Sequence, residues 1–541
     1  MERRLSEFFD AGTARRAGYA GEFPVPGNDP VITGLEYDSR KLKPGNLFFA
    51  LPGLHTDGRR YIRDAVEKGA ACVVLEDGSR GREPAEIPAG IPSIPVGNPR
   101  FAMSPLAAAF YGFPSRRLGI IGVTGTEGKS TVVSLIFQLL RLMGKKAGFF
   151  STVQYNTGGE TQWNPEHQTT PEATAVQRLL WEMAENGCEY AVAEASSHGL
   201  SPVTNRLGDV DFDAAVVTNV TREHLEFHGT WEQYRDDKAN LFRALDRERI
   251  RTGNPGRNGG AEGGPEPFGV INADDPSADF FAEATTKKTL RFSVRGMEAD
   301  LSLRSIEPGA FGNWYEVSIA GEGETVDLRD QLPGAFNAGN VLAALLVVSK
   351  LSALPVREIA PLVSLLKPVR GRMTPVANNL GFEVLVDYAH TPSSFLTIFP
   401  PLRNRANRDG KRIISLFGSA GERDTGKRPE QGKVAAEYSD SIILTDEDPR
   451  GEKPGDILEE IAGGFEKKRG FEKWKRGENL FLIPDRPLAI RKALSLARKG
   501  DIVLLLGKGH ENSIIYSENT ISFDEIHEAE KALAEMNPPE N

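Results

Sequence analysis

The stretch LGIIGVTGTEGKSTVVSLIFQLLRLMG, residues 118–144, decides how the central part of the chain folds. Residues 118–123 are a short apolar run rich in β-branched side chains, which is typical of a buried parallel strand. Residues 124–128 contain glycines, and from Lys129 the apolar residues recur at helical spacing as far as Gly144, which fits a C-terminal cap. The sequence therefore predicts a strand, a glycine turn and a helix in direct succession.

Such a turn aims backbone N–H groups and the positive end of the helix dipole at one place, where a phosphate fits. Lys129 would reach the outer phosphates of a nucleoside triphosphate, and the Ser130 hydroxyl would bind a magnesium ion. The stretch departs from the strict phosphate-loop pattern, because Val123 stands where that pattern has glycine, between Gly122 and Gly125. We predict nucleoside triphosphate binding; the alternative is a glycine turn without a ligand.

Length and composition narrow the possible classes of protein. A chain of 541 residues is too long for one hydrophobic core and predicts several domains. It has 65 Lys and Arg against 75 Asp and Glu, a net charge of −10, which disfavours nucleic-acid binding by general electrostatics. The 2 cysteines predict no disulfide framework and fit a reducing cytoplasm. No signal peptide or membrane-spanning apolar run is recognised, so we expect a cytoplasmic protein without a membrane partner.

Polar residues follow the predicted strands of the central region. Glu194 ends the apolar run 190–194, and the segment with His224 and His228 follows the run 214–218. Ligands bind at the carboxyl edge of open α/β sheets, so Glu194 and His224 can both reach the phosphate loop. Taken singly, Glu194 could be a solvated carboxylate and His228 a satisfied loop histidine. Beside a nucleotide loop, they predict a second metal site.

The C-terminal region repeats the pattern of strand followed by polar residues. Because each predicted strand ends in polar residues, we expect a doubly wound sheet with its site on one edge. The glycine-rich residues 250–267 predict a flexible surface insertion without chemistry. The predicted C-terminal strands cover residues 382–386, 413–417, 441–445 and 501–506.

Several separate motifs together resemble one family, the Mur ligases, and occur in the order found there. The resemblance covers almost the whole chain, and within the family it favours the members that add the third residue of the peptidoglycan stem peptide. The motifs are TGTEGKST (124–131), EASSHGL (194–200), TNVTREHLEFHG (218–229), LPGAFNAGN (332–340), GRM (371–373), VDYAHTP (386–392), GERDTGKRP (421–429) and GKGHE (507–511).

The resemblance implies an α/β fold of three domains. These are an N-terminal α/β UDP-sugar-binding domain over residues 1–115, a central P-loop-type ATPase domain with a mostly parallel sheet over 116–370, and a C-terminal Rossmann-like α/β domain that binds the amino acid over 371–541. It also implies small-molecule substrates, and we expect a monomer. Alternatives are another amide ligase of this fold, such as a folylpolyglutamate synthetase, and a non-catalytic nucleotide-binding relative.

The implied reaction is an ATP-dependent ligation. The D-glutamate carboxylate of UDP-N-acetylmuramoyl-L-alanyl-D-glutamate attacks the γ-phosphate of ATP, and the amine of an amino acid then displaces phosphate from the acyl phosphate. Because two anions meet in the first step, Mg²⁺ and Lys129 should neutralise the developing charge.

The resemblance also implies the residues of the ATP and metal sites. Catalytic roles fall to Lys129, Glu194, His224 and Lys238. The metal ligands would be Ser130, Glu194, His224 and Lys238, the last as a carbamate (N6-carboxylysine), because a bare ammonium would repel a metal; without the motif, Lys238 reads as an ordinary exposed helix lysine. The ATP contacts would be Gly125, Thr126, Glu127, Gly128, Lys129, Ser130, Thr131, Asn337, Asn340, Arg372, Asp387 and His390.

Two further sets of residues are implied for the other substrates. The UDP-substrate contacts would be Tyr37, Ser39, His55, Gln168, Thr169, Thr170, Ser196 and Arg206. Gln168 departs from the asparagine that the family often has, and the segment before Arg206 is longer than usual. The amino-acid contacts would be Arg423, Glu447, Asp448, Pro449, Arg450, Gly507 and Glu511.

The identity of the added amino acid depends on residues 447–450. Members that add diaminopimelate usually read Asp-Asn-Pro-Arg, whereas this chain reads Glu-Asp-Pro-Arg. Arg450 can hold the far carboxylate of diaminopimelate in a bidentate manner. Asp448 could instead neutralise Arg450, or hold the ammonium of lysine or ornithine. We expect a dibasic amino acid and favour meso-diaminopimelate, with lysine and ornithine as alternatives.

Overall fold

The computed structural model describes residues 1–19, 21, 29–52, 57–78, 87–164, 168–221, 225–248, 266–309, 312–466 and 468–536. His55, His224 and nearly all of the glycine-rich segment 250–267 lie outside these residues. The chain divides into two compact units, which we describe separately. The first unit comprises Met1–Ser302 and Leu342–Ile359, and the second comprises Leu303–Val341 and Ala360–Asn541.

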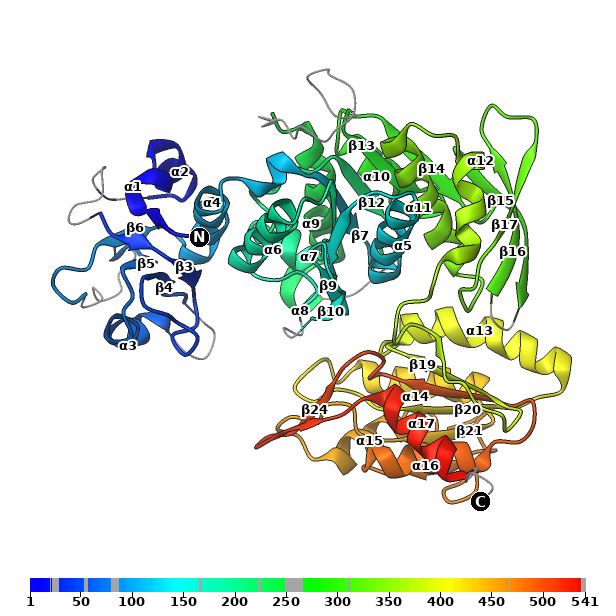
Figure 1. Cartoon of the computed structure of the whole chain (residues 1–541). Coiled ribbons are helices and arrows are strands. Elements are labelled where there is room, and N and C mark those ends of the chain that lie inside the picture. Colours follow the sequence, from blue (N-terminus) through cyan, green and yellow to red (C-terminus); the bar gives the residue numbers. More distant parts are fainter. Residues whose placement is uncertain are drawn as a thin grey trace, which may run out of the picture. The chain divides into compact units, whose positions relative to one another are not determined.

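The first unit begins with a small parallel sheet in the order β3-β4-β5-β6 (Figure 1). Alternate residues of β4 face opposite sides: Phe49 joins the core under α4, and Phe48 joins the core under α3. The elements are β1 (Arg3–Arg4), α1 (Leu5–Phe8), α2 (Ala11–Arg16), β2 (Val31–Ile32), β3 (Gly34–Glu36), β4 (Asn46–Phe49), η1 (Gly58–Tyr61), α3 (Ile62–Glu67), β5 (Cys72–Glu76), β6 (Ser93–Val96) and α4 (Pro99–Phe110).

A larger sheet follows, in which the strands of the first unit lie in the order β10-β9-β8-β11-β7-β12-β13-β14. From β8 to β14 all neighbours in this order are parallel. The elements are η3 (Pro114–Arg117), β7 (Gly119–Thr124), α5 (Lys129–Leu142), β8 (Ala147–Phe150), β9 (Gln154–Asn156), β10 (Gln162–Trp163), α6 (Ala173–Glu185), β11 (Tyr190–Glu194), α7 (Ser197–Leu200), β12 (Ala214–Val217), α8 (Leu225–His228), α9 (Trp231–Arg243), η4 (Ala244–Asp246), β13 (Phe268–Asn272), α10 (Ala278–Glu283) and β14 (Thr289–Ser293).

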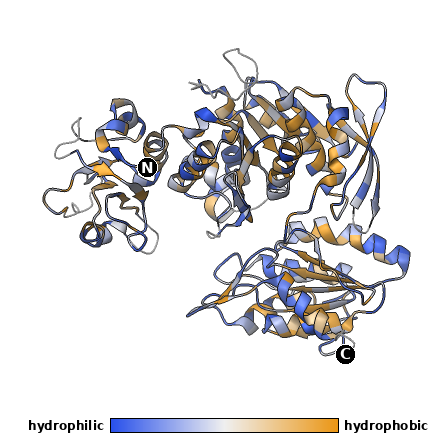
Figure 2. Ribbon diagram, viewed as in Figure 1, coloured by the Kyte–Doolittle hydropathy of each residue, from blue (hydrophilic) through white to orange (hydrophobic). Residues whose placement is uncertain are grey.

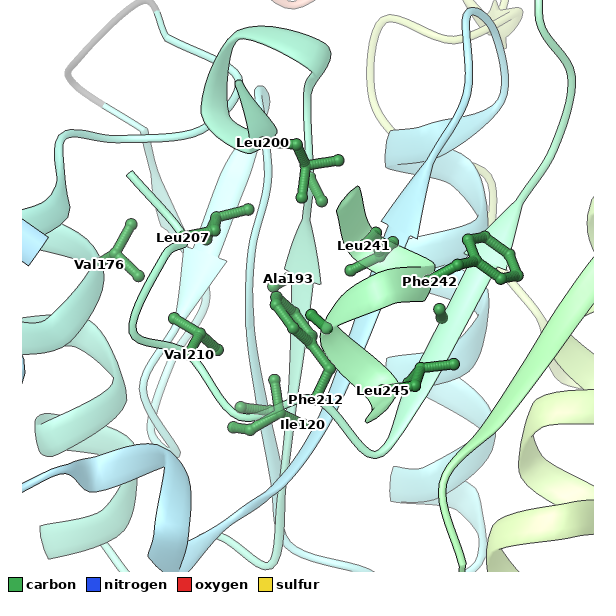
Figure 3. Close-up of a cluster of buried hydrophobic side chains, with 14 of the residues drawn as sticks. Ile120, Val176, Ala193, Leu200, Leu207, Val210, Phe212, Leu241, Phe242 and Leu245 are labelled. Carbon is green, nitrogen blue, oxygen red and sulfur yellow. The ribbon is translucent and has the colours of Figure 1, made fainter. Parts of the chain in front are cut away.

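Helices cover both faces of this sheet (Figure 1). On one face, Ile120 of β7 and Ala193 of β11 share a core with side chains of α6, α9 and α10, and Figure 3 shows Leu241 and Phe242 of α9 in this cluster. On the other face, Phe137 of α5 contacts Phe149 of β8, with ring centroids 4.7 Å apart. A Cβ at Gly122 would lie 2.5 Å from Leu241, so the glycine allows α9 to pack closely on the central strand.

The second unit contains a sheet in the order β18-β19-β23-β20-β21-β22, parallel except for β18. The strands are apolar, and the helices beside them carry polar residues on their outer sides (Figure 2). One core lies under α13, α14 and α15, and another under α16 and α17. The predicted doubly wound sheet is confirmed. The four predicted strands correspond to β19, β20, β21 and β23, whereas β22 was not predicted from the sequence.

The elements of the second unit extend from the end of the first. Strand β15 (Leu301–Gly309) begins in the first unit and leads to the antiparallel pair β16 (Gly312–Ile319) and β17 (Thr325–Arg329). Helix α11 (Asn337–Ser352) begins in the second unit and continues into the first, to which α12 (Val356–Ile359) belongs. The remaining elements of the second unit are η5 (Ala360–Leu365), β18 (Thr374–Pro375), β19 (Glu383–Asp387), α13 (Pro392–Asp409), β20 (Ile413–Phe417), α14 (Lys427–Tyr438), β21 (Ser441–Leu444), α15 (Pro454–Ala462), β22 (Leu480–Leu482), α16 (Arg486–Leu496), β23 (Ile502–Leu506), β24 (Ser513–Ile515), β25 (Thr520–Ser522) and α17 (Glu525–Met536).

Two smaller points concern the cysteines and the apolar helices. Cys72 and Cys188 are buried and form no disulfide, and burial raises the pKa of the Cys72 thiol to about 12. In the described part of the chain no single helix is long and apolar enough to cross a membrane. By length and composition alone, only the pair α11 and 356–365 would pass as a broken span, and it is bent by 111°.

Candidate active site

The predicted strand, glycine turn and helix are confirmed as β7, the loop 125–128 and α5. Gly125 and Gly128 have φ values of 146° and 84°, in the left-handed region that side chains disfavour. A Cβ at Gly125 would lie 1.9 Å from the Thr218 hydroxyl, so only glycine fits there. Glycine at 125 therefore lets the loop pack closely against the residues that follow β12.

The end of the neighbouring strand β12 holds this loop in place. The N–H groups of Thr126 and Glu127 donate to the backbone and side-chain oxygens of Asn219, at 2.8 and 2.9 Å. The Thr218 hydroxyl donates to the Glu127 carbonyl at 2.5 Å. Thr218 and Asn219 had no predicted role, because nothing in the local sequence pattern shows which neighbouring strand supports the loop.

Ser130 and Glu194 lie together, as predicted from their places at a helix start and a strand end. The Ser130 hydroxyl is 3.0 and 2.9 Å from the two Glu194 carboxylate oxygens. The Thr152 N–H and hydroxyl also donate to Glu194, at 2.8 and 3.1 Å. Glu194 is only 1% exposed, which excludes a solvated carboxylate. A hydroxyl beside a carboxylate offers the oxygen ligands that hard divalent cations take.

Two lysines donate to consecutive carbonyls of the loop. Lys129 Nζ lies 2.7 Å from the Thr126 oxygen, and Lys238 Nζ lies 2.7 Å from the Gly125 oxygen. Lys238 is 1% exposed and lies over the Tyr234 ring, 4.3 Å from its centroid. Lys238 is therefore not an exposed helix lysine but a buried amine against the phosphate loop. We call Lys129, Ser130, Glu194 and Lys238 the phosphate-loop cluster.

The oxygen atoms of Ser130 and Glu194 fit a magnesium ion, whereas Lys238 fits one only as a carbamate. The described residues include no group of three or more His, Cys, Asp and Glu side chains that could hold a metal. Ser130 and Glu194 supply oxygen ligands, and a carbamate on Lys238 would add another. His224, the fourth predicted ligand, lies outside the described residues.

His228 is a satisfied buried histidine, one of the two alternatives for it. Its Nδ1 lies 2.7 Å from an Asp237 carboxylate oxygen, and its Nε2 lies 3.0 Å from the Ser197 hydroxyl. These contacts join α8 and α7 to α9, the helix that carries Lys238. His228 thus supports the helix of the predicted carbamate.

Part of the predicted UDP-substrate set also comes together in the first unit. The Thr170 hydroxyl lies 3.0 Å from the Ser196 hydroxyl, and an Arg206 Nη donates to the Thr170 carbonyl at 2.7 Å. Arg206 therefore lies beside Thr170 and Ser196 despite the longer segment before it. The buried Oε1 of Gln168 has no hydrogen-bond partner among the described residues. Thr169 lies between Gln168 and Thr170 in the sequence. Tyr37 and Ser39 follow β3 in the N-terminal sheet.

The remaining predicted ATP contacts lie in the second unit. Asn337 and Asn340 are bonded through their side-chain amides, at 2.9 Å. The Arg372 guanidinium lies over the Tyr388 ring, 4.9 Å from its centroid, and His390 packs against the same ring. Burial raises the pKa of the Asp387 carboxyl, which accepts hydrogen bonds from two backbone N–H groups.

Two of the predicted amino-acid contacts, Asp448 and Glu511, pair with a buried lysine that had no predicted role. Lys508 Nζ donates to Asp448 Oδ1 at 2.9 Å and to a Glu511 carboxylate oxygen. Burial alone would lower the pKa of Lys508, but the neighbouring Glu511 and Asp448 raise it above its usual value. Neither suggested role of Asp448 anticipated this pairing. The GKGHE motif contained the signal, since a lysine stands three residues before the predicted ligand Glu511.

Other polar atoms of this region are buried without a partner among the described residues. They are Asp446 Oδ1, Glu447 Oε2 and Arg450 Nε. A Cβ at Gly507 would lie 3.1 Å from Glu447 Oε2, so the glycine leaves room beside that carboxylate. Pro449 is buried, whereas Arg423 is exposed. We call Asp446, Glu447, Asp448, Arg450, Lys508 and Glu511 the C-terminal cluster.

Comparison with known proteins places this geometry in a family. Residues 31–111 match the model described as "Mur ligase family, catalytic domain", residues 123–348 match "Mur ligase middle domain", and residues 371–509 match "Mur ligase, glutamate ligase domain". A solved structure titled UDP-N-acetylmuramoyl-L-alanyl-D-glutamate–2,6-diaminopimelate ligase superposes with a TM-score of 0.59 at 27% identity, covering 93% of this chain and 95% of that one. The chain belongs to the Mur ligase family and has its three-domain fold.

Within the family, the chain is most usefully compared with two curated relatives. It is 51% identical to the UDP-N-acetylmuramyl-tripeptide synthetase of Treponema denticola, over 94% of this chain and 95% of that protein. It is 36% identical to the UDP-N-acetylmuramoyl-L-alanyl-D-glutamate–2,6-diaminopimelate ligase of Geobacillus kaustophilus, over 94% and 96% of the two chains. The resemblance predicted from the motifs is confirmed, down to the tripeptide-forming group.

Proposed function

We propose that this protein is an ATP-dependent ligase that adds a dibasic amino acid to the D-glutamate of UDP-N-acetylmuramoyl-L-alanyl-D-glutamate, in peptidoglycan precursor synthesis. The observation that carries the proposal is the 51% identity to a tripeptide synthetase along nearly the whole chain. The phosphate-loop cluster supports it, because Lys129, Ser130, Glu194 and Lys238 are all present and, Lys129 apart, buried.

A carboxylate resists attack by an amine because its leaving group would be oxide. Transfer of the γ-phosphoryl group of ATP to a carboxylate oxygen gives an acyl phosphate, from which phosphate leaves readily. The attacking carboxylate and the triphosphate are both anions, so positioning and charge neutralisation should supply most of the catalysis. Magnesium bound to the triphosphate supplies part of that neutralisation.

The chain's own residues take the remaining roles. The N–H groups at the start of α5 would cradle the phosphates, while those of Thr126 and Glu127 hold the loop against Asn219. Lys129 leaves the Thr126 carbonyl to reach the outer phosphates, while Ser130 and Glu194 would hold the metal. Thr170, Ser196 and Arg206, with the unpaired Gln168 amide oxygen, are proposed to bind the UDP-linked substrate, together with Tyr37, Ser39 and Thr169.

The proposed nucleotide contacts of the second unit have a simple physical rationale. Asn337 and Asn340 offer amide groups to the adenine, and Arg372, Asp387 and His390 gather around Tyr388 to contact the ribose and phosphates. We propose residues 1–115, 116–370 and 371–541 as the three domains, and a monomer in the cytoplasm as the working form.

The C-terminal cluster is proposed to bind the incoming amino acid. Glu447 has an unpaired carboxylate oxygen for an ammonium, and Arg450 has an unpaired guanidinium nitrogen for a carboxylate. Because Lys508 already pairs with Asp448, Arg450 is not neutralised by that carboxylate. meso-Diaminopimelate offers both an ammonium and a carboxylate at its far end and is the favoured substrate. Lysine and ornithine would leave Arg450 without a partner.

The test is phosphate release with ATP, Mg²⁺, UDP-muramoyl-dipeptide and each candidate amino acid, with the product identified by mass spectrometry. We expect a dibasic amino acid to stimulate release and to appear in a UDP-muramoyl-tripeptide. Folyl substrates and glutamate serve as controls for the folylpolyglutamate synthetase alternative. Absence of product with every dibasic amino acid would overturn the proposal.

A further inference from the structure

A buried arginine outside the predicted site joins the two segments that carry the C-terminal cluster. Arg486 begins α16, and its side chain is fully buried. One Nη donates to the Asp446 carbonyl and the other to the Leu506 carbonyl, each at 2.7 Å. Asp446 directly precedes the segment 447–450, and Leu506 directly precedes the segment 507–511.

The backbone of the sheet fixes the spacing of these two segments only indirectly, through one intervening strand. They follow β21 and β23, which are not neighbours, because β20 lies between them in the strand order. No ladder of hydrogen bonds therefore runs directly from one to the other. The guanidinium of Arg486 directly links the two residues that precede the segments, and Lys508 joins the segments a second time through Asp448.

The positive charge of Arg486 is compensated within the protein. Nε and one Nη of Arg486 donate to the two carboxylate oxygens of Glu525 at 2.7 and 2.9 Å, and Glu525 is also fully buried. A buried charge without a partner would be strongly destabilising, so the pair forms a unit. Since Glu525 satisfies the charge, the remaining N–H groups are available for the two strand-end carbonyls.

We propose that Arg486, held by Glu525, is a positioning residue that sets the distance between Glu447 and Arg450 on one segment and Glu511 on the other. Arg486 does not touch the substrate; it acts through the segments that do. The expected effect on kinetics rests on the proposed function. The hydrogen bonds from which the positioning role is inferred do not depend on that function.

The chain offers a matched control on the same helix pair. Arg491 of α16 donates to Glu528 and Glu535 of α17, at 2.6 and 2.8 Å, and contacts neither segment. Arg491→Met thus removes two ion pairs between α16 and α17 without removing a contact to the segments. Arg486→Lys keeps a charge for Glu525 but cannot donate to both carbonyls as the guanidinium fork does.

The kinetic experiment measures KM for all three substrates in wild type, Arg486→Met, Arg486→Lys and Arg491→Met. We expect Arg486→Met to raise KM for the amino acid about tenfold or more, as loss of charge-assisted hydrogen bonds predicts. KM for ATP and for the UDP-linked substrate should stay within about twofold, and Arg491→Met should resemble wild type. Parallel changes in all three KM values, or the same effect in Arg491→Met, would overturn the inference.

Hydrogen–deuterium exchange tests the contact without any reaction. Exchange should increase in segments 446–450 and 507–511 in both Arg486 variants, and stay unchanged there in Arg491→Met. If Arg486→Met does not fold, Arg486→Lys and Glu525→Gln replace it, and unchanged exchange in both would refute the positioning role. If wild type ligates no dibasic amino acid, the proposed function fails while the exchange data still decide this inference.

Discussion

The phosphate-loop cluster and the C-terminal cluster differ in whether their buried polar atoms have hydrogen-bond partners. In the first, the amines of Lys129 and Lys238 donate to loop carbonyls, and Ser130 donates to Glu194. In the second, Glu447 Oε2 and Arg450 Nε are buried without a partner among the described residues. One cluster satisfies its own polar groups, whereas the other keeps some of them unpaired.

Under the proposed function, we expect the two clusters to respond differently when a ligand binds. Buried polar atoms without partners cost about 1–3 kcal/mol each, so a substrate that pairs with them binds favourably. The phosphate-loop cluster, as proposed, would instead exchange internal hydrogen bonds for bonds to phosphate and metal. We therefore expect mutations in the first to act mainly on turnover, and mutations in the second to act mainly on the choice and affinity of the amino acid.

The largest expected effect is on turnover, from Lys129→Ala. Removing a charge that stabilises the transition state typically costs about 10²-fold or more in kcat. Phosphate release at saturating substrates is the measurement. Lys145→Ala is the matched control, because Lys145 forms only a partly exposed ion pair with Glu189. Near-normal turnover in Lys129→Ala would show that the amine does not serve the phosphates.

Lys238 tests whether the phosphate-loop cluster needs a carbamate. Lys238→Arg keeps a cation near the Gly125 carbonyl but cannot form the carbamate, so we expect kcat to fall about tenfold to a hundredfold through weaker metal binding. Added bicarbonate should raise the activity of CO₂-depleted wild type and leave Lys238→Arg unchanged. A bicarbonate response that is equal in both proteins would contradict the modification.

Arg450 tests the role of the unpaired guanidinium in the C-terminal cluster. Arg450→Ala should raise KM for meso-diaminopimelate about tenfold or more, since a charge-assisted pair contributes about 1.5–3 kcal/mol. KM for lysine should change much less, because lysine has no second carboxylate. Competition assays with both amino acids measure the ratio, and equal losses for the two would remove the carboxylate contact from the account.

The smallest effect is on stability and comes from Asp446. Burial raises its carboxyl pKa to about 6, against the hydrogen bond from Tyr516 and the charge of Arg486, while Asp485 raises it further. The folded state therefore holds this proton more tightly than the unfolded chain, whose pKa is about 4, so stability falls as pH rises between these values.

Asp446→Asn removes this titration. The free energy of unfolding of the variant, relative to wild type, should rise by about 1–3 kcal/mol between pH 4 and pH 7. Denaturant unfolding at the two pH values measures it, with Asp409→Asn on an exposed helix end as control. A constant difference would mean that the Asp446 carboxyl titrates alike in the folded and unfolded chain.

The phosphate loop, the strand ends and the main parallel strands could be predicted from the sequence, because each depends on a local pattern of residues. The spacing of the glycines predicted the turn 125–128, and the apolar run that ends in a carboxylate predicted the place of Glu194 at a strand end. It could not predict Thr218 and Asn219 as supports of the loop, since strand order is set by long-range packing. The role of Arg486 could not be predicted for the same reason, because its partners lie 20 to 40 residues away along the chain.

The central claim is that the D-glutamate carboxylate is activated as an acyl phosphate, and an isotope measurement tests it most directly. In UDP-muramoyl-dipeptide labelled with ¹⁸O in that carboxylate, one labelled oxygen becomes the bridge between carbon and phosphorus. When the amine attacks the carbon, the C–O bond breaks and this oxygen leaves with the phosphate. The account predicts one ¹⁸O atom in the released phosphate for each tripeptide formed, and phosphate without label would contradict it.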